Sequence, residues 1–482
     1  MEYILKDLNP NLVFKYFEDI SQIPRGSKNE KAISDYLKAF GESLGLETMQ
    51  DNALNVIIKK PATKGYENAP GVILQGHMDM VCEKNKDTVH DFENDPIELQ
   101  IKDGFIHANG TTLGADNGIA VAMGMAVLAS NDISHPALEL LVTTDEEAGM
   151  SGAMALDASV LNGKYILNLD SEEEGYLLVS CAGGVTVTTT LDVDYTDVDP
   201  SNECLLIEIT GLFGGHSGMD VIKQRGNANV LMGRILHNLN SNFNICSISG
   251  GSKNNAIPRE AECIIAVESS NTSKVIESIK QMEEIFKNEF STSDPGIVVK
   301  VSSVDREPKC FDNASTSKVV TELSLIPNGI QTMSMDIPGL VESSTNIGVL
   351  RTTDSTVTFE CLSRSSVTSL KQEIVNKMEI LANTLNGKVE LASDYPAWEY
   401  SKGSKLEDIC ANVYEDLRGE KPIVMALHAG LECGLLLDKM PHAEAISLGP
   451  DMFDVHTPSE KLNIQSTANT WEYLLKILEA IK

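Results

Sequence analysis

The sequence predicts an α/β domain with a mostly parallel central sheet, interrupted by an inserted α+β lid domain. Over the first 180 residues, short apolar strands alternate with amphipathic helices, which is the pattern of an α/β domain. From about Gly183 the strands alternate and become rich in Thr, Val and Ile, and the helices become charged. After about Leu391 the first pattern returns. We therefore expect residues 1–183 and 391–482 to form one domain and residues 184–390 to form the other.

The elements of the first domain follow from hydrophobic periodicity. Helices are expected over residues 12–23 and 29–44, where apolar side chains recur on one face. Residues 118–129 are apolar on all sides, which predicts a buried helix. Strands are expected at residues 55–58, 71–74, 138–143 and 165–169, and the last two are the continuous apolar runs typical of strands covered on both faces. Beyond Leu391 we expect strands at 423–426 and 443–447 and helices at 430–437 and 465–481.

The inserted domain contains an internal duplication, with repeats of about 184–292 and 293–390. Each repeat has the order β-α-β-β-α. The first series is 205–209, 224–239, 243–249, 261–268 and 273–290. The second series is 297–304, 314–325, 345–351, 356–362 and 366–385. Two such units can join edges into one long antiparallel sheet with helices on one face.

Charge and composition exclude several functions. The 482 residues include 70 acidic and 38 basic side chains, so the formal net charge is −32. Such an excess of carboxylates repels nucleic acid and anionic membrane surfaces, and we expect neither as a partner. The N-terminal segment shows no secretory signal, and the longest apolar stretch is too short to span a bilayer. The cysteine count is nine, with no C-x-x-C pair, which favours reduced, buried thiols in a cytoplasmic protein.

Histidine, aspartate and glutamate residues, which are common metal ligands, follow the predicted strands or begin the buried helix. They are His77, Asp79, Asp116, Glu146, Glu147, Asp170 and His456. Open α/β sheets place ligands at the carboxyl ends of their strands, and a mixed set of His and carboxylate ligands suits zinc or a similar transition metal. The set has more carboxylates than one tetrahedral zinc needs, whereas two metals that share Asp116 as a bridge would use all of them.

Taken singly, each motif has a simpler interpretation. His77 and Asp79 could form a surface pair, and Asp116 could cap a helix. The Asp145–Glu147 run could be a solvated loop. A purely structural hypothesis would treat all these acids as ordinary surface, and metal analysis of the purified protein distinguishes it from a metal centre.

A longer set of motifs resembles, in the same order, those of the dinuclear zinc peptidases related to carboxypeptidase G, aminoacylase and carnosinase. The motifs are IPRGSKNE, HMDMV, TLGADNGIA, TTDEEAGMSGA, NLDSEE, FGGHSG, NAIPR, HAGLECG and DVHTP. The resemblance covers nearly the whole chain and implies a peptidase with two Zn²⁺ per chain, for which Mn²⁺ or Co²⁺ could substitute.

The resemblance also implies a role for each candidate residue of the first domain. Asp116 would bridge two ions, with His77 and Asp170 completing one site and Glu147 and His456 completing the other. Asp79 would support His77, and Glu146 would be the general base that takes a proton from the attacking water. Family members with Asp at the position of Asp170 look like aminopeptidases and dipeptidases, whereas those with Glu look like carboxypeptidases and deacylases.

Further residues are implied for the inserted domain and the end of the chain. His216 would stabilise the tetrahedral oxyanion, and Asn255 and Arg364 would bind the oxyanion and the C-terminal carboxylate of the substrate. His428 would lie near the pocket for a substrate side chain. In single-lid relatives the histidine comes from a partner subunit. A doubled lid could imitate that dimer within one chain, so we expect either a monomer with a pseudo-dimeric lid or a homodimer.

The function implied is a metal-dependent dipeptidase that hydrolyses unblocked dipeptides, including Xaa-His and β-alanyl-histidine. The alternative within enzymes is a tripeptide aminopeptidase or an N-acyl amino acid deacylase with the same metal centre. A non-catalytic peptide-binding member is disfavoured because Glu146, which binding alone would not need, is present.

Overall fold

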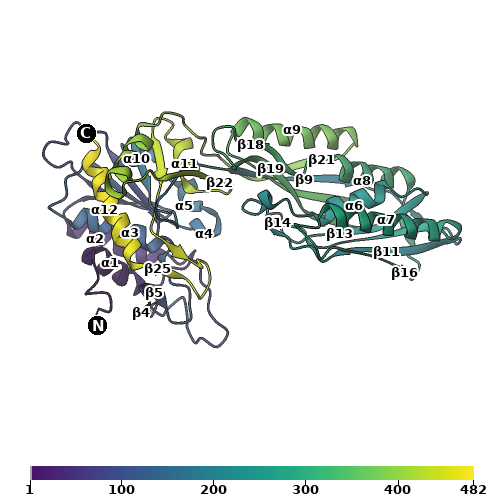
Figure 1. Ribbon diagram of the computed structural model, residues 1–482, viewed down its shortest axis with the longest axis horizontal. Helices are drawn as coiled ribbons and strands as arrows, with labels where there is room; N and C mark the ends of the chain where they lie inside the picture. The colour runs from purple at the N-terminus through teal and green to yellow at the C-terminus, as the bar shows by residue number, and fades with distance from the viewer. Residues whose placement is uncertain (1–2) are drawn as a thin grey trace. The chain divides into compact units, whose positions relative to one another are not determined.

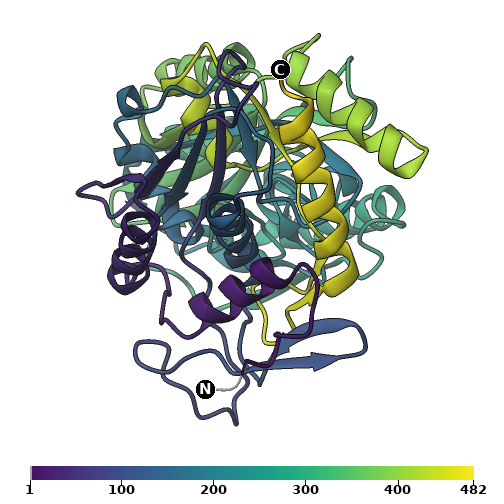
Figure 2. The same cartoon turned by 90° about the vertical axis from the view of Figure 1, so that its left-hand side faces the viewer.

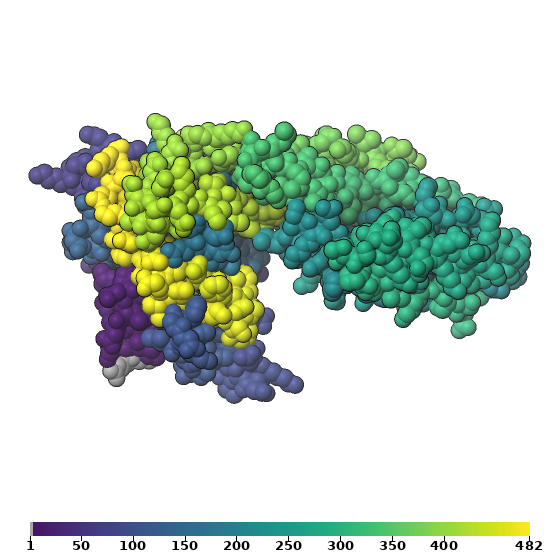
Figure 3. Space-filling view, in the orientation of Figure 1, coloured from purple at the N-terminus to yellow at the C-terminus, as the bar shows by residue number. Residues whose placement is uncertain are grey.

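The computed structural model describes residues 3–482 and divides into two compact units. Unit 1 comprises residues 1–180, 400–426 and 431–482, of which the first two lie outside the described residues. Unit 2 comprises residues 181–399 and 427–430. Within unit 1, surface from the two ends of the chain lies side by side, purple against yellow in the space-filling view (Figure 3). Unit 1 is therefore built from both ends of the chain.

An eight-stranded sheet forms the centre of unit 1 (Figure 1). Its strands, in spatial order, are β1 (Glu47–Gln50), β2 (Val56–Lys60), β6 (Leu138–Thr143), β3 (Val72–His77), β7 (Tyr165–Asn168), β23 (Glu444–Ser447), β8 (Tyr176–Cys181) and β22 (Ile423–Leu427). The central strands β6, β3, β7 and β23 run parallel, and β1, β2 and β8 pair antiparallel at the flanks. Every residue of β3, β6 and β7 is buried, which explains why these strands are apolar along their whole length.

Helices flank this sheet (Figure 2). They are α1 (Asn11–Ser21), α2 (Lys31–Ser43), α3 (Ala115–Ala129), α4 (Glu146–Gly149), α5 (Ser151–Ala155), α10 (Lys405–Arg418), α11 (Glu432–Lys439) and α12 (Ile464–Ala480). The expected apolar helix is α3, which packs against α1 and β3 and is almost entirely buried. A small sheet beside them has the order β24 (Met452–Phe453), β25 (Lys461–Asn463), β5 (Phe105–Ala108) and β4 (Leu99–Lys102).

Unit 2 contains a long antiparallel sheet. Its main path is β16 (Val298–Val304), β11 (Asn202–Thr210), β15 (Ala261–Glu268), β13 (Phe243–Gly250), β19 (Val341–Thr352), β20 (Thr356–Ser365), β9 (Gly183–Asp192) and β21 (Lys388–Tyr395), and β18 (Gly329–Met333) pairs with β19. The helices of this unit are α6 (Ala228–His237), α7 (Thr272–Glu289), α8 (Asn313–Leu325) and α9 (Thr368–Thr384). All four helices bury side chains in one apolar core with the strands, and the ribbon shows them over one face of the sheet (Figure 1).

The strand pairing of unit 2 differs from a simple tandem repeat. The sequence places residues 297–304 at the start of the second repeat, but the strand there, β16, pairs with β11 of the first series. The corresponding neighbour of β20 is β9, which precedes the first series along the chain. The reason is that α7 returns the chain to the free edge beside β11, so β16 ends the first half. The two halves meet where β13 pairs with β19, at Gly250 and Leu350.

Residues 391–399 and 427–430 depart from the expected boundaries. The sequence assigns both segments to the α/β domain, yet both cluster with unit 2. The Ala182 backbone N–H lies 3.0 Å from the carbonyl oxygens of both Leu427 and Ala429, and these contacts hold residues 427–430 beside the start of unit 2. His428 therefore belongs to unit 2.

The cysteines behave as small buried apolar side chains. None of the nine forms a disulfide, and all except Cys82 are buried. Burial raises the pKa of several of their thiols, including those of Cys263 and Cys361, so they remain protonated. None of the helices in the described part of the chain is long and apolar enough to cross a membrane.

Candidate functional site

The carboxyl ends of three parallel strands carry most of the candidate metal ligands. His77 is the last residue of β3, and Asp79 follows two residues later. Glu146 begins α4, three residues beyond the end of β6, and Asp170 lies two residues beyond the end of β7. Because neighbouring parallel strands end at the same edge of a sheet, these side chains converge there.

Two further ligands come from segments outside the sheet. Asp116 lies at the start of α3, where its backbone is not helical (φ −80°, ψ 108°). His456 lies between β24 and β25 with φ +62°. The backbone at Asp116 directs its carboxylate across the ends of the strands rather than along the helix. The helix-cap interpretation is wrong, since this carboxylate makes its contacts with two histidines.

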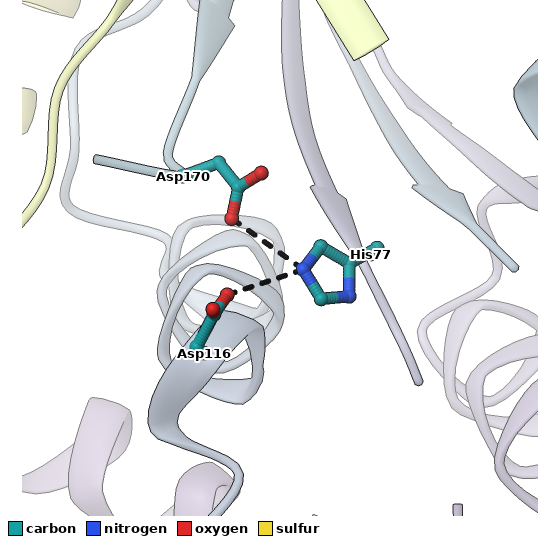
Figure 4. A group of neighbouring side chains, drawn as sticks. All are labelled: His77, Asp116 and Asp170. Carbon is teal, nitrogen blue, oxygen red and sulfur yellow. Dashed lines mark hydrogen bonds and ion pairs between the residues drawn. The ribbon is translucent and has the colours of Figure 1, made fainter. Parts of the chain in front are cut away.

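The geometry places Asp116 between two histidines. Its Oδ1 lies 3.2 Å from Nε2 of His77, and its Oδ2 lies 3.2 Å from Nε2 of His456. His77 Nε2 is also 3.5 Å from Oδ1 of Asp170, as Figure 4 shows, and His456 Nε2 is 3.0 Å from Oε1 of Glu147. Each oxygen of Asp116 thus belongs to a separate trio of one histidine and two carboxylates.

The donor set fits a pair of divalent cations. The potential ligand atoms of His77, Asp116 and Asp170 lie within 4.8 Å of one another, and so do those of Asp116, Glu147 and His456. Among residues 3–482, the ion pairs of these three carboxylates are with the two histidines. Closely spaced carboxylates of low exposure repel one another unless cations neutralise them. The excess of carboxylates over positive groups therefore suits dications.

Burial and the crowding of carboxylates raise several pKa values in this cluster. Burial raises the pKa of Asp170 to about 7, and it raises the pKa of Glu146 well above its usual range. The contacts of His456 with Asp116 and Glu147 raise the pKa of the imidazole to about 11. Without cations, the cluster would hold protons in place of metal charge, so protons and metal ions compete for these ligands.

Asp79 holds His77 and the backbone of Glu146 and Glu147 in place. Its Oδ1 lies 3.2 Å from Nδ1 of His77, which favours the proton on Nδ1 and leaves Nε2 free to ligate. The same carboxylate accepts hydrogen bonds from the backbone N–H groups of Glu146 (3.1 Å) and Glu147 (3.2 Å), and from Ser27 Oγ (2.8 Å). One fully buried carboxylate thus fixes both His77 and the two glutamates.

A second cluster lies within unit 2 and contains His216 and Asn255. The short strands β12 (Gly215–His216) and β14 (Ala256–Ile257) pair, with His216 opposite Ala256. The Ser217 N–H donates to the Asn255 carbonyl at 2.9 Å, so the two predicted residues are neighbours. His216 Nδ1 accepts from the N–H groups of Gly218 (3.2 Å) and Met219 (3.1 Å). These bonds leave the proton on Nε2, which makes that atom a hydrogen-bond donor.

Arg364 approaches the same cluster from β20. Its Nη1 donates to the Tyr395 hydroxyl at 2.7 Å, and its Nε finds no hydrogen-bond partner among the described residues. The side chain is buried, with 6% of its surface exposed. A buried guanidinium with an unused N–H suits an anionic partner such as a carboxylate. Burial, followed by the charge of Arg364, lowers the pKa of His216 and keeps it neutral.

His428 lies close to both residues. Its Nε2 is 2.7 Å from Ser344 Oγ, and Ser344 is paired with Arg364 across β19 and β20. A Cβ atom on Gly218 would overlap the His428 carbonyl oxygen, which explains the glycine after His216-Ser217. Burial, together with the smaller effects of Arg364 and His216, lowers the pKa of His428 to about 3. The imidazole is therefore neutral, and its Nδ1 is unpaired among residues 3–482.

Sequence reasoning missed three supporting residues. Ser27 lies in IPRGSKNE, a motif within the family resemblance, so a signal for it was present. Tyr395 and Ser344 lie in strands with no distinguishing motif. They reach Arg364 and His428 only through sheet pairing, which a single sequence does not reveal.

Comparisons with known proteins identify the family of this chain. A family model described as Peptidase family M20/M25/M40 matches residues 73–480. The cytosol non-specific dipeptidase of Escherichia coli K12 is 36% identical over 479 residues, which cover 99% of each chain. The crystal structure of aminoacylhistidine dipeptidase from Vibrio alginolyticus is 39% identical with a TM-score of 0.94, covering 99% of this chain and 98% of that one.

More distant structures share the fold. Aminopeptidase PepT from Bacillus cereus matches with a TM-score of 0.58 at 18% identity, covering 98% of this chain and 99% of that one. The expected α/β fold and the peptidase resemblance are thus confirmed, and the chain belongs to Peptidase family M20/M25/M40, whose members are hydrolases of peptide bonds.

Proposed function

We propose that this protein is a cytoplasmic, zinc-dependent dipeptidase that hydrolyses unblocked dipeptides, including Xaa-His and β-alanyl-histidine. The observation that carries the proposal is Asp116, whose two carboxylate oxygens face two different histidines, as a ligand shared by two metals would. One ion would be held by His77, Asp116 and Asp170, and the other by Asp116, Glu147 and His456. The names of the two full-length relatives support a dipeptidase.

Each group has a distinct task in this proposal. Two zinc ions held by the two trios would lower the pKa of the attacking water and polarise the scissile carbonyl. Glu146 takes the proton of that water and passes it to the leaving amine. The N–H at Nε2 of His216 donates to the developing oxyanion, and Asn255 adds a second polar group beside it.

Substrate selection is assigned to the cluster around Arg364. Its guanidinium binds the C-terminal carboxylate of the substrate, while the neutral imidazole of His428 faces the substrate side chain. A carboxylate that must sit one residue beyond the scissile bond excludes longer peptides. The closest alternatives are a tripeptide aminopeptidase and an N-acyl amino acid deacylase with the same metal centre.

A substrate panel tests the proposal. We expect the purified protein to hydrolyse Xaa-His dipeptides and β-alanyl-histidine, to lose activity with a chelator, and to regain it with zinc. Elemental analysis should find two metal ions per chain, with manganese and cobalt as functional substitutes. Faster turnover of tripeptides or N-acyl amino acids would overturn the dipeptidase assignment, and full activity in a metal-free protein would overturn the metal centre.

Replacing Arg364 by alanine should weaken substrate binding more than chemistry. Loss of a hydrogen-bonded ionic contact costs about 1.5–3 kcal/mol, so KM for a dipeptide should rise about 10- to 100-fold. The same substitution should change KM much less for a dipeptide amide, which lacks the carboxylate. Arg351→Ala, which removes an exposed arginine from β19 of the same sheet, is the matched control. Equal effects of Arg364→Ala on the acid and the amide would contradict the assignment.

A further inference from the structure

The backbone that carries Asp116 is held by one buried carboxylate. Glu460 Oε2 accepts hydrogen bonds from the N–H groups of Leu113 (2.7 Å) and Gly114 (3.0 Å). Its Oε1 accepts from those of Ala115 (2.8 Å) and Asp116 (3.3 Å). Four consecutive backbone donors thus converge on a side chain that is 2% exposed. Such an arrangement fixes the peptide planes that lead into Asp116.

A buried arginine holds the same segment from another direction. Arg25 Nη2 donates to the Gly114 carbonyl at 2.5 Å, and Nη1 donates to the carbonyls of Met78 (3.1 Å) and Asp79 (3.3 Å). Met78 and Asp79 directly follow the ligand His77 along the chain. Arg25 therefore ties the segment before Asp116 to the segment after His77. Asp116 and His77 belong to the same ligand trio.

The glycines of the TLGADNG motif make room for this arginine. A Cβ atom on Gly114 would lie 2.5 Å from Arg25 Nη2, and one on Gly118 would lie 2.6 Å from the same nitrogen. Gly114 also has φ +68°, which a side chain would strain. The motif around Asp116 is thus shaped by a guanidinium that is about 90 residues away along the chain.

We propose that Arg25 and Glu460 are a pair of positioning residues that hold Asp116 in its bridging orientation. Neither belongs to the ligand trios, and both bind backbone groups of the segment that leads into Asp116. Their opposite charges compensate each other in a buried site, where an isolated charge would be costly. The inference rests on the proposed metal-dependent function and adds the residues that determine how strongly the ions are held.

Glu460→Gln tests the proposal with a side chain of the same shape. The amide removes the negative charge and turns one acceptor into an N–H donor that faces backbone N–H groups. We expect zinc affinity, measured by titrating the metal-free protein against a chelating indicator, to fall about 10- to 100-fold. Arg25→Lys should weaken zinc affinity in the same direction, because one ammonium cannot reach three carbonyls in the directions of a guanidinium.

Glu139→Gln is the matched control. Glu139 is also buried and also accepts backbone N–H bonds, from Asn162 and Gly163. It lies near the start of β6, whereas the candidate ligands follow the ends of the strands. This variant should lower the urea midpoint of unfolding and leave zinc affinity at the wild-type value. Circular dichroism of each metal-free variant shows whether it is folded, and Arg25→Lys provides the measurement if Glu460→Gln does not fold.

The possible outcomes separate this inference from the proposed function. Wild-type zinc affinity in both folded variants would overturn the positioning role while the dipeptidase remained intact. A wild-type protein that binds two zinc ions but cleaves no dipeptide would overturn the function and leave the positioning role to be judged by affinity. Because the two residues hold one segment, the double variant should lose little more affinity than the more damaging single variant. Additive losses would mean that they act separately.

Discussion

Glu146→Gln is expected to lose most turnover while it keeps its metal ions. Glutamine has the shape of glutamate but cannot accept a proton, so the variant removes general-base catalysis alone. Such catalysis contributes about 10²- to 10⁴-fold, and kcat on a dipeptide should fall by that factor. The proposed ligand is its neighbour Glu147, whose Oε1 contacts His456. Elemental analysis of the variant should therefore still find two ions per chain.

A neighbouring acid supplies the control for this experiment. Glu173 is exposed and lies three residues after Asp170, so Glu173→Gln removes one carboxylate of the same acidic region. Its kcat and metal content should equal those of the wild type. A near wild-type kcat in Glu146→Gln would show that another group takes the proton. Loss of metal from that variant would show that Glu146 is a ligand.

The positions of the ligands were predictable because they depend on a local rule. Polar residues directly after buried parallel strands meet at one edge of the sheet, so β3, β6 and β7 were sufficient to bring His77, Glu146 and Asp170 together. Asp116 and His456 were candidates from their places at the start of the buried helix and after a predicted strand, but both lie on irregular backbone, and only the family resemblance indicated their roles. The buried helix was expected from residue 118, and the regular helical backbone of α3 does begin there, after the non-helical Asp116 and Asn117.

Long-range pairing was not predictable from the sequence. Nothing local indicates that β16 pairs with β11, that β9 pairs with β20, or that residues 427–430 join unit 2. Arg25 lies in the IPRGSKNE motif, but its contacts and those of Glu460 were not predictable, since their partners are backbone groups far away along the chain. Backbone groups carry no sequence signal, so side chains that bind them are found only in three dimensions.

His216→Ala is expected to produce the second large loss of activity. Its Nδ1 is occupied by two backbone N–H groups, so the imidazole presents a donor at Nε2. Removing one oxyanion donor costs about 10²- to 10³-fold in kcat. KM and metal content should change little, because the residue is in unit 2 and outside the ligand set. His442→Ala, at an exposed histidine of unit 1, should retain wild-type kcat.

Mixing two inactive proteins then tests which chain His216 serves. Glu146→Ala keeps an intact His216, and His216→Ala keeps an intact Glu146. If the histidine acts across a dimer interface, a mixed dimer contains one complete site, and combining the variants should restore activity. The sheet of unit 2 contains two halves that meet where β13 pairs with β19. In our proposal these halves form a doubled lid, which would supply within one chain what a dimer of single-lid subunits supplies. We therefore expect no recovery after mixing, and restored activity would show that the histidine acts between subunits.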